Sequence, residues 1–442
     1  LPPIPDEPLS PPLTYMVPRL LVGISAPESN PACLGFSTWS EVSVWLTALN
    51  DPQVLESEAL VSAARDLANG FSDQFSRIRT IGEYVQSLNY VSVQIGLGRG
   101  GGYRPRSAKE VFASSYGDCK DKVNLMRTML RVIGLQSLPV AVYSGDPNYV
   151  FEGWPSPAQF NHYIIGIQLD ENAECACDSI VEPSGFGRLL IFDPTEDDVP
   201  LGILPRHQQG GLGLLVAGKE GALIRLPLTN PEDNRTERSI EATLSDTGDL
   251  NAEVIERTFG RPAVSERKLH RGASRGEYRD LIERWIVRGA PGATVADLES
   301  EDDYNLNQFA LRVKLTAPRY GQSMQGQLLI FRPILIERRG SSLPNSSDRK
   351  NPIWLGSKIY DDEVRVELPP GFGVDELPDD ILLEEEFGTY SATFVVEGSR
   401  LGFSRRLILR GSILPAQRYD KVKWFFERIR NVEQTPVVLA RD

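Results

Sequence analysis

The chain of 442 residues has little of what usually marks a specialised class of protein. Its net charge is −13, so it lacks the basic surplus with which proteins bind nucleic-acid phosphates. No apolar run approaches the roughly 20 residues that a membrane-spanning helix needs. Four cysteines are too few for a disulfide scaffold of this length. We therefore expect no nucleic-acid partner and no membrane span, and the 41% of hydrophobic residues suffices for ordinary cores.

Histidine is also scarce, because the chain contains only His162, His207 and His270. His207 lies in a loop rich in glutamine and glycine, and His270 lies in a charged segment predicted to be helical. His162 instead opens an apolar run that is typical of a strand. A lone histidine beside a strand is usually structural. His162 is nevertheless the one histidine placed to serve a cysteine, because it opens a strand and lies between Cys119 and Asp193 in the chain order of a thiol triad.

Cys119 stands where a helix is expected to begin. Apolar residues recur after it at helical spacing, at Val123, Met126, Leu130 and Ile133. Asp118 and Asp121 suit the helix start and are candidate caps. The free N–H groups and the dipole at such a start favour a thiolate, and Lys120 and Lys122 add positive charge nearby. A small buried cysteine is the common alternative, but the histidine and aspartate downstream favour a nucleophile.

Two predicted strands place an aspartate near that histidine. The first runs from His162 to Leu169, and the second, Leu189–Phe192, is followed by Asp193 and by a proline that cannot continue a central strand. If the two strands pair as a long hairpin, the start of one lies beside the end of the other. A nucleophilic thiol needs a base and a third group that orients the imidazole. The sequence therefore predicts a triad of Cys119, His162 and Asp193.

These segments resemble the transglutaminase-like superfamily, which has a papain-type cysteine fold. The likeness covers roughly residues 36–215 and is carried by Tyr90–Gln94, Gly101–Pro105, Ala108–Phe112, Tyr116–Lys122, Phe160–His162 and Phe192–Thr195. The resemblance implies that Cys119 is the nucleophile, His162 the base and Asp193 the group that orients the imidazole. It also places Tyr103 about where animal transglutaminases carry an aromatic donor to the oxyanion. Gln94 is the rival candidate for that role.

One departure from the family bears on the reaction. Animal cross-linking enzymes carry an aromatic residue directly after the cysteine, where this chain has Lys120. The resemblance therefore favours a cysteine peptidase or amidase that hydrolyses an amide bond of a peptide or protein through a thioester. Two alternatives remain open, an acyl transferase to an amine and a non-catalytic binding or assembly module. No metal or organic cofactor is expected, and no calcium-loop motif is visible.

Composition divides the chain into three parts. Residues 1–35, rich in proline and serine, are interpreted as a linker or as the tail of an upstream domain. Residues 36–223 form the predicted α+β cysteine domain, of transglutaminase-like (papain-type) fold. Residues 224–442 contain alternating strand runs, a helical insert at 262–288 and a closing helix, which indicates a β-sandwich-like domain. The closest likeness is to bacterial multi-domain proteins with such an arrangement. These are commonly exported, so the periplasm or the cell surface is expected.

The remaining cysteines carry no motif of their own. Cys175 and Cys177 lie in an acidic segment and lack visible partners for a metal site. We interpret them as surface thiols, either free or paired. Cys33 lies in the N-terminal segment, and its partner cannot be assigned from spacing alone.

Overall fold

The structure is a computed structural model of the chain. It describes residues 4–22, 35–92, 102–175, 177–337 and 349–441. Contacts divide the chain into two compact units, Pro12–Thr229 and Asn230–Asp442, and Leu1–Pro11 belongs to the second. The N-terminal segment thus contributes to both units. Glu7 accepts a hydrogen bond from the backbone of Asn351 at 2.8 Å, whereas Arg19 donates to the carbonyl of Tyr149 at 2.6 Å.

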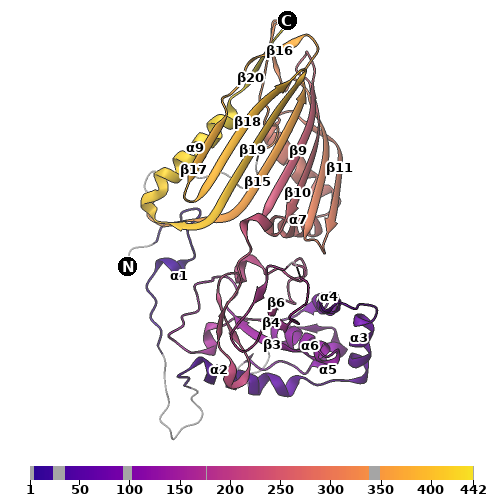
Figure 1. The fold of residues 1–442 in the computed structure, drawn as a ribbon, viewed down its shortest axis with the longest axis vertical. Helices are drawn as coiled ribbons and strands as arrows, with labels where there is room; N and C mark the ends of the chain where they lie inside the picture. The colour runs from indigo at the N-terminus through magenta and orange to yellow at the C-terminus, as the bar shows by residue number, and fades with distance from the viewer. Residues whose placement is uncertain (1–3, 23–34, 93–101, 176, 338–348, 442) are drawn as a thin grey trace. The chain divides into compact units, whose positions relative to one another are not determined.

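The unit Pro12–Thr229 packs helices against one face of a sheet (Figure 1). Its helices are α1 (Leu13–Met16), α2 (Trp39–Asn50), α3 (Glu58–Ala68), α4 (Gln74–Gln86), α5 (Ala108–Ser114) and α6 (Cys119–Val132). Among the described residues, six strands form an antiparallel sheet in the order β5 (Ile180–Val181), β6 (Leu189–Phe192), β4 (His162–Gln168), β3 (Ser137–Val142), β7 (Leu212–Leu215) and β8 (Leu223–Arg225). Two short strands, β1 (Asn89–Tyr90) and β2 (Tyr116–Gly117), pair in parallel.

Helix α6 forms because its sequence is amphipathic and capped. Its apolar residues Met126, Met129 and Leu130 are fully buried in the core shared with β4 and β6. Burial of each such side chain contributes about 1.5–3 kcal/mol. The helix therefore packs on the sheet, and this packing fixes the position of its first residue, Cys119.

The register of the central strands positions the predicted site. Strands β4 and β6 are antiparallel, with Ile165 opposite Phe192. His162, the first residue of β4, and Asp193, which directly follows β6, therefore lie at the same edge of the sheet. The predicted pairing of these two strands is confirmed, although the connection between them also contains β5, which pairs with the outer side of β6.

The second unit is built on one large sheet (Figure 1). In its described part, eight strands follow the order β11 (Thr294–Asp303), β12 (Gln308–Ala317), β10 (Leu250–Phe259), β9 (Arg235–Leu244), β15 (Ile353–Glu367), β19 (Arg400–Leu414), β18 (Gly388–Glu397) and β17 (Ile381–Glu385). The pair β9–β15 is parallel and the other pairs are antiparallel. A small sheet contains β13 (Gln322–Met324), β14 (Leu328–Phe331), β20 (Val437–Arg441) and β16 (Phe372–Glu376). The helices are α7 (Arg261–Gly272), α8 (Arg275–Gly289) and α9 (Tyr419–Gln434).

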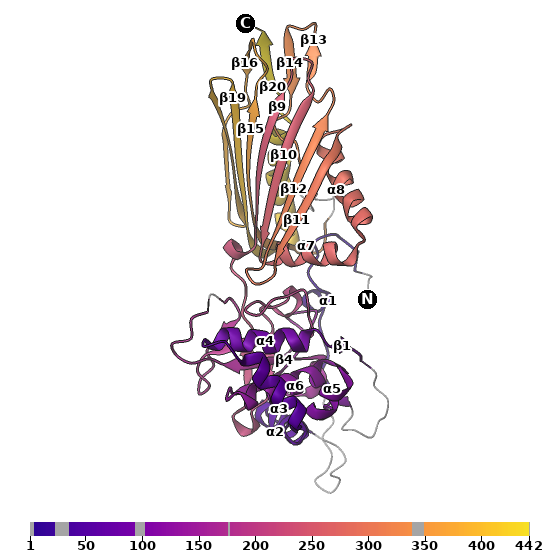
Figure 2. The same cartoon turned by 90° about the vertical axis from the view of Figure 1, so that its right-hand side faces the viewer.

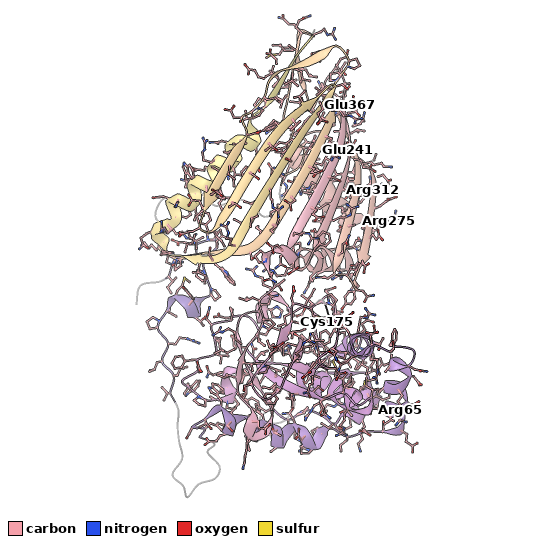
Figure 3. The ribbon with its side chains drawn as sticks, in the orientation of Figure 1. Arg65, Cys175, Glu241, Arg275, Arg312 and Glu367 are labelled. Atoms are coloured by element: carbon pink, nitrogen blue, oxygen red, sulfur yellow. A yellow bond between two sulfur atoms is a disulfide. The ribbon has the colours of Figure 1, made fainter. Side chains whose placement is uncertain are left out.

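Helices supply much of the layer that covers the large sheet, and Figure 2 shows α8 running beside it. Trp285 and Ile286 of α8, and Phe425 and Ile429 of α9, are buried in the same core as the inward side chains of the strands. The opposite face carries charged residues, among them Glu241, Arg312 and Glu367 (Figure 3). The expected α+β class is confirmed, but a sandwich of two large sheets is not. No helix among the described residues is long and apolar enough to cross a membrane.

Candidate active site

Cys119 is the first residue of α6 and is held there by a capping box. Asp118 accepts a hydrogen bond from the backbone N–H of Asp121 at 3.2 Å, and Asp121 accepts one from the N–H of Asp118 at 3.3 Å. The backbone N–H of Cys119 has no hydrogen-bond partner within the described residues, as expected in the first turn of a helix. The thiol is free and partly exposed. A reacting group at the sulfur therefore also meets an unoccupied N–H donor.

His162 and Asp193 form a buried pair. The Nε2 atom of His162 lies 2.9 Å from Oδ2 of Asp193, whose side chain is only 1% exposed. Gln208 donates to the same Oδ2 at 2.5 Å. The other carboxylate oxygen, Oδ1, accepts from the backbone N–H of Thr195 at 2.9 Å and from its hydroxyl at 2.7 Å. The carboxylate is therefore fixed by donors on both oxygens, and it fixes the imidazole ring.

These contacts set the charges of the pair. Burial by itself lowers the pKa of His162, but the charge and hydrogen bond of Asp193, with those of Cys119, raise it to about 10. Burial raises the pKa of Asp193, yet His162 and the hydrogen bonds from Thr195 and Gln208 bring it below its usual value. At neutral pH the pair is therefore an imidazolium and a carboxylate.

Cys119 contributes to raising the pKa of both His162 and Tyr90, so both side chains lie near the start of α6. Because Nε2 of His162 is bound to Asp193, Nδ1 is the ring nitrogen left for the sulfur. Of the three residues that the sequence proposed as a triad, the structure thus joins His162 and Asp193 directly, and the effect of Cys119 on the pKa of His162 indicates that the thiol lies nearby.

Tyr90 is the site residue that sequence reasoning missed. It ends β1 and pairs with Gly117 of β2, and the N–H of Val91 donates to the carbonyl of Gly117 at 3.0 Å. This pairing carries Tyr90 to the residues that precede Cys119. Tyr90 belongs to one of the segments that resemble the transglutaminase-like superfamily. Its pairing with β2 could not be predicted, because strands of two residues are too short to show a periodic pattern.

The two residues proposed as oxyanion donors remain predictions. Tyr103 is half-buried, with its ring edge-on to Trp45 at a centroid distance of 5.2 Å, and burial raises its pKa. No hydrogen bond joins Tyr103 to Cys119 within the described residues. Gln94 lies outside the described residues, as does most of the glycine-rich segment Gly98–Gly102.

The two lysines expected to support the thiol are engaged elsewhere. Lys120 forms an ion pair with Asp118. The ammonium group of Lys122 is buried and donates to the backbone carbonyls of Gln86 and Leu88 at 3.2 and 3.0 Å. Burial is also the main cause that lowers the pKa of Lys122. Neither positive charge is left free for the thiol.

The other described cysteines of this unit, and His207, have partners of their own. Cys175 (labelled in Figure 3) and Cys177 are joined in a disulfide, which decides between the free and paired states. Cys33 lies outside the described residues. His207 lies 3.8 Å from a carboxylate oxygen of Glu196. The described ranges contain no group of three or more histidine, cysteine or acidic residues that could hold a metal ion.

Comparisons with known proteins concern the fold and the C-terminal region. Residues 327–439 match a family described as a domain of unknown function with a solved structure (DUF3858). A solved structure described as a "putative protease", from Parabacteroides distasonis, is similar over 92% of this chain with a TM-score of 0.53 and 13% sequence identity. This chain covers 59% of that neighbour, less than two thirds of its length. No curated protein matches the chain. At this identity the likeness establishes a shared fold.

Proposed function

We propose that the chain is a transglutaminase-like cysteine hydrolase, a peptidase or amidase that cleaves an amide bond of a peptide or protein. The observation that carries the proposal is the buried pair of His162 and Asp193, 2.9 Å apart, together with Cys119 at the start of α6, which contributes to the raised pKa of His162. The description of the solved neighbour as a protease, although the identity is low, agrees with this class of reaction.

The reaction follows from the charges of these groups. With the proton on His162, the sulfur of Cys119 attacks the carbonyl carbon, and the carbonyl electron pair moves to oxygen. The N–H of Cys119 binds that oxyanion. As the C–N bond breaks, His162 gives its proton to the leaving amine and a thioester remains. Water then attacks the thioester, His162 takes up a proton from it, and the acid is released as the sulfur is restored.

Hydrolysis is favoured over transfer to an amine by the polar surroundings of the thiol. A transferase must exclude water from its thioester. The residues next to Cys119 are instead the ion pair of Asp118 and Lys120, and the neighbouring Tyr90 is half-exposed. Export to the periplasm or cell surface is part of the proposal, and the Cys175–Cys177 disulfide agrees with an oxidising compartment.

The test is product analysis by mass spectrometry, with a glutamine-containing peptide pool and a millimolar primary amine. Free acids or cleaved peptides are expected from the native protein, and none from Cys119→Ser. Cys33→Ser serves as the matched thiol control and is expected to keep activity. Predominant amine adducts would replace the hydrolase by a transferase. No product, together with a Cys119 inert to iodoacetamide, would leave a binding module as the better account.

A further inference from the structure

Gln208 reaches the buried pair of His162 and Asp193 from a separate turn of the chain. It ends a 3-10 helix, Arg206–Gln208, and its backbone N–H donates to the carbonyl of Pro205 at 3.0 Å. Gln208 is 1% exposed, and its Nε2 atom donates to Oδ2 of Asp193 at 2.5 Å. His162 binds that same oxygen at 2.9 Å. One carboxylate oxygen is therefore shared between the imidazole and the amide of Gln208.

The neighbouring Gln209 shows how a glutamine that serves only the fold is bound in this loop. Its Nε2 atom donates to the carbonyl of Leu204 at 2.7 Å and to the hydroxyl of Thr229 at 2.9 Å, and its Oε1 atom accepts from the N–H of Thr229 at 3.3 Å. The Oε1 atom of Gln208 is instead buried without a hydrogen-bond partner among the described residues. A buried acceptor without a partner destabilises the fold, so the contact with Asp193 is what Gln208 supplies.

Gln208 is also a donor without charge. A carboxylate only accepts hydrogen bonds, so the amide of Gln208 must present its nitrogen to Asp193. The charged groups of α6 that act on the pair are Cys119, on His162, and Lys122, on Asp193. The ammonium group of Lys122 donates to backbone carbonyls instead of to the carboxylate. Gln208 therefore stabilises the charge of Asp193 without replacing the imidazolium as its partner.

This stabilisation matters most after His162 has given up its proton. In the resting pair the imidazolium compensates the carboxylate. Once the proton has left, the carboxylate of Asp193, which is 1% exposed, faces a neutral ring. A buried carboxylate is costly unless hydrogen-bond donors surround it. Thr195 supplies two donors to Oδ1, whereas the amide of Gln208 is the donor that joins the ring on Oδ2.

We propose that Gln208 is a positioning residue that stabilises the site once His162 has donated its proton, and this inference rests on the function proposed above. No bond to Gln208 forms or breaks. As the C–N bond of the substrate breaks, the amine nitrogen keeps the electron pair of that bond and takes the proton from His162. Gln208 acts through Asp193, because a better stabilised carboxylate holds that proton less tightly.

Nuclear magnetic resonance of the imidazole tests the inference without a substrate. The chain has three histidines, and His162→Gln identifies the signal of His162. Burial lowers the pKa of His162, but Asp193 and Cys119 raise it to about 10. The titration therefore uses Cys119→Ser, which removes the contribution of the thiol and brings the midpoint below that value. In this background we expect Gln208→Met, which keeps the length of the side chain, to bind the proton of His162 about tenfold more tightly.

Two further variants make this titration decisive. Gln209→Met removes the amide of the neighbouring residue in the same loop and should leave the pKa of His162 unchanged. Gln208→Glu keeps the shape of the side chain but presents an ionised acceptor to Asp193, so it should raise the pKa of His162 further than Gln208→Met does. The second variant also replaces the first should Gln208→Met fail to fold.

Two probes of protein with Cys119 intact relate the titration to the reaction. Acylation by p-nitrophenyl acetate releases a phenolate that needs no proton, whereas cleavage of the glutamine-containing peptide pool must protonate an amine. In Gln208→Met we expect peptide cleavage to fall by about tenfold, while ester acylation stays of the same order. Gln209→Met should change neither rate.

The outcomes separate the inference from the function on which it rests. The inference is overturned if Gln208→Met leaves the pKa of His162 unchanged or lowers it, if Gln209→Met raises it equally, or if both probes slow equally in Gln208→Met. A native protein that is not acylated by the ester and cleaves no peptide would overturn the proposed function. In that case a raised pKa in Gln208→Met would show that Gln208 only tunes the buried pair.

Discussion

The carboxylate of Asp193 is 1% exposed and lies 2.9 Å from the imidazole of His162, so a buried charge orients this ring. Burying a carboxylate is costly unless donors surround it. Here Thr195 and Gln208 supply them, from the residues that follow β6. The geometry of the thiol site therefore depends on a hydrogen-bond network behind the histidine.

Asp193→Asn tests that dependence. The asparagine side chain carries no negative charge, and its nitrogen donates hydrogen bonds where the carboxylate oxygen accepted them. His162 therefore loses both its charged partner and its fixed tautomer. We expect the rate of substrate hydrolysis to fall by roughly 10⁴-fold, as in other triads that lose this charge. Steady-state kinetics on whichever peptide the product analysis identifies would measure it.

Thr195→Val is the graded control for this change. It removes the hydroxyl donor to Oδ1 but keeps the backbone N–H donor of the same residue. Because a single hydrogen bond contributes about 1 kcal/mol, activity should fall by less than about tenfold. Equal losses in the two variants would contradict the idea that the charge of Asp193 is what matters.

The pH dependence of stability follows from the pKa of His162. Its folded-state pKa is raised from 6.5 to about 10, so its stabilising effect is complete below 6.5 and is lost as pH rises toward 10. Asp193 has a lowered pKa, so its contribution is present above its usual value of 3.8 and disappears only on acidification below it. We expect the difference in unfolding free energy between native protein and His162→Gln to shrink between pH 6.5 and 10. Denaturant titrations along this range would measure it, and a constant difference would count against the charged pair.

A glycine before the nucleophile is required by packing. A Cβ added to Gly117 would lie 2.7 Å from Cβ of Asp121 and 3.3 Å from a side-chain carbon of Val111. Gly117→Ala must therefore displace the capping residue of α6, and we expect a loss of about 1–3 kcal/mol in stability together with reduced alkylation of Cys119. Gly276→Ala is the control, since its Cβ meets nothing within 4 Å in the first turn of α8. It should be neutral or stabilising by up to about 1 kcal/mol, and a similar loss in both would refute the packing argument.

Local chemistry explains which parts of this arrangement could be predicted from the sequence. Helix α6 could be predicted because its amphipathic period and its capping residues lie close together in the sequence. The same holds for the two apolar runs that form β4 and β6. Strand β11 has no strand pattern in its sequence because it is an edge strand, acidic and exposed along most of its length, with Val295 as its buried side chain. The pairing of Tyr90 with Gly117, two residues before Cys119, could not be predicted because it is a tertiary pairing of two very short strands.

The cap of α6 should matter more for chemistry than for stability. Asp118→Ala removes the acceptor for the N–H of Asp121 and the ion-pair partner of Lys120. The loss of a cap costs about 0.5–2 kcal/mol, and the first turn, which contains the nucleophile, is the part that frays. We therefore expect a modest drop in melting temperature with a disproportionate drop in hydrolysis.

Asp73→Ala provides the matched comparison. Asp73 caps α4 by accepting from the N–H of Ser76 at 2.7 Å, so its loss should destabilise the same unit by a similar amount. No triad residue belongs to α4, so hydrolysis at a temperature well below unfolding should be unchanged. If the two variants lose activity in the same proportion to stability, the cap of α6 acts only through the fold. If Asp118→Ala alone loses activity, the cap holds Cys119 and its N–H where the reaction needs them.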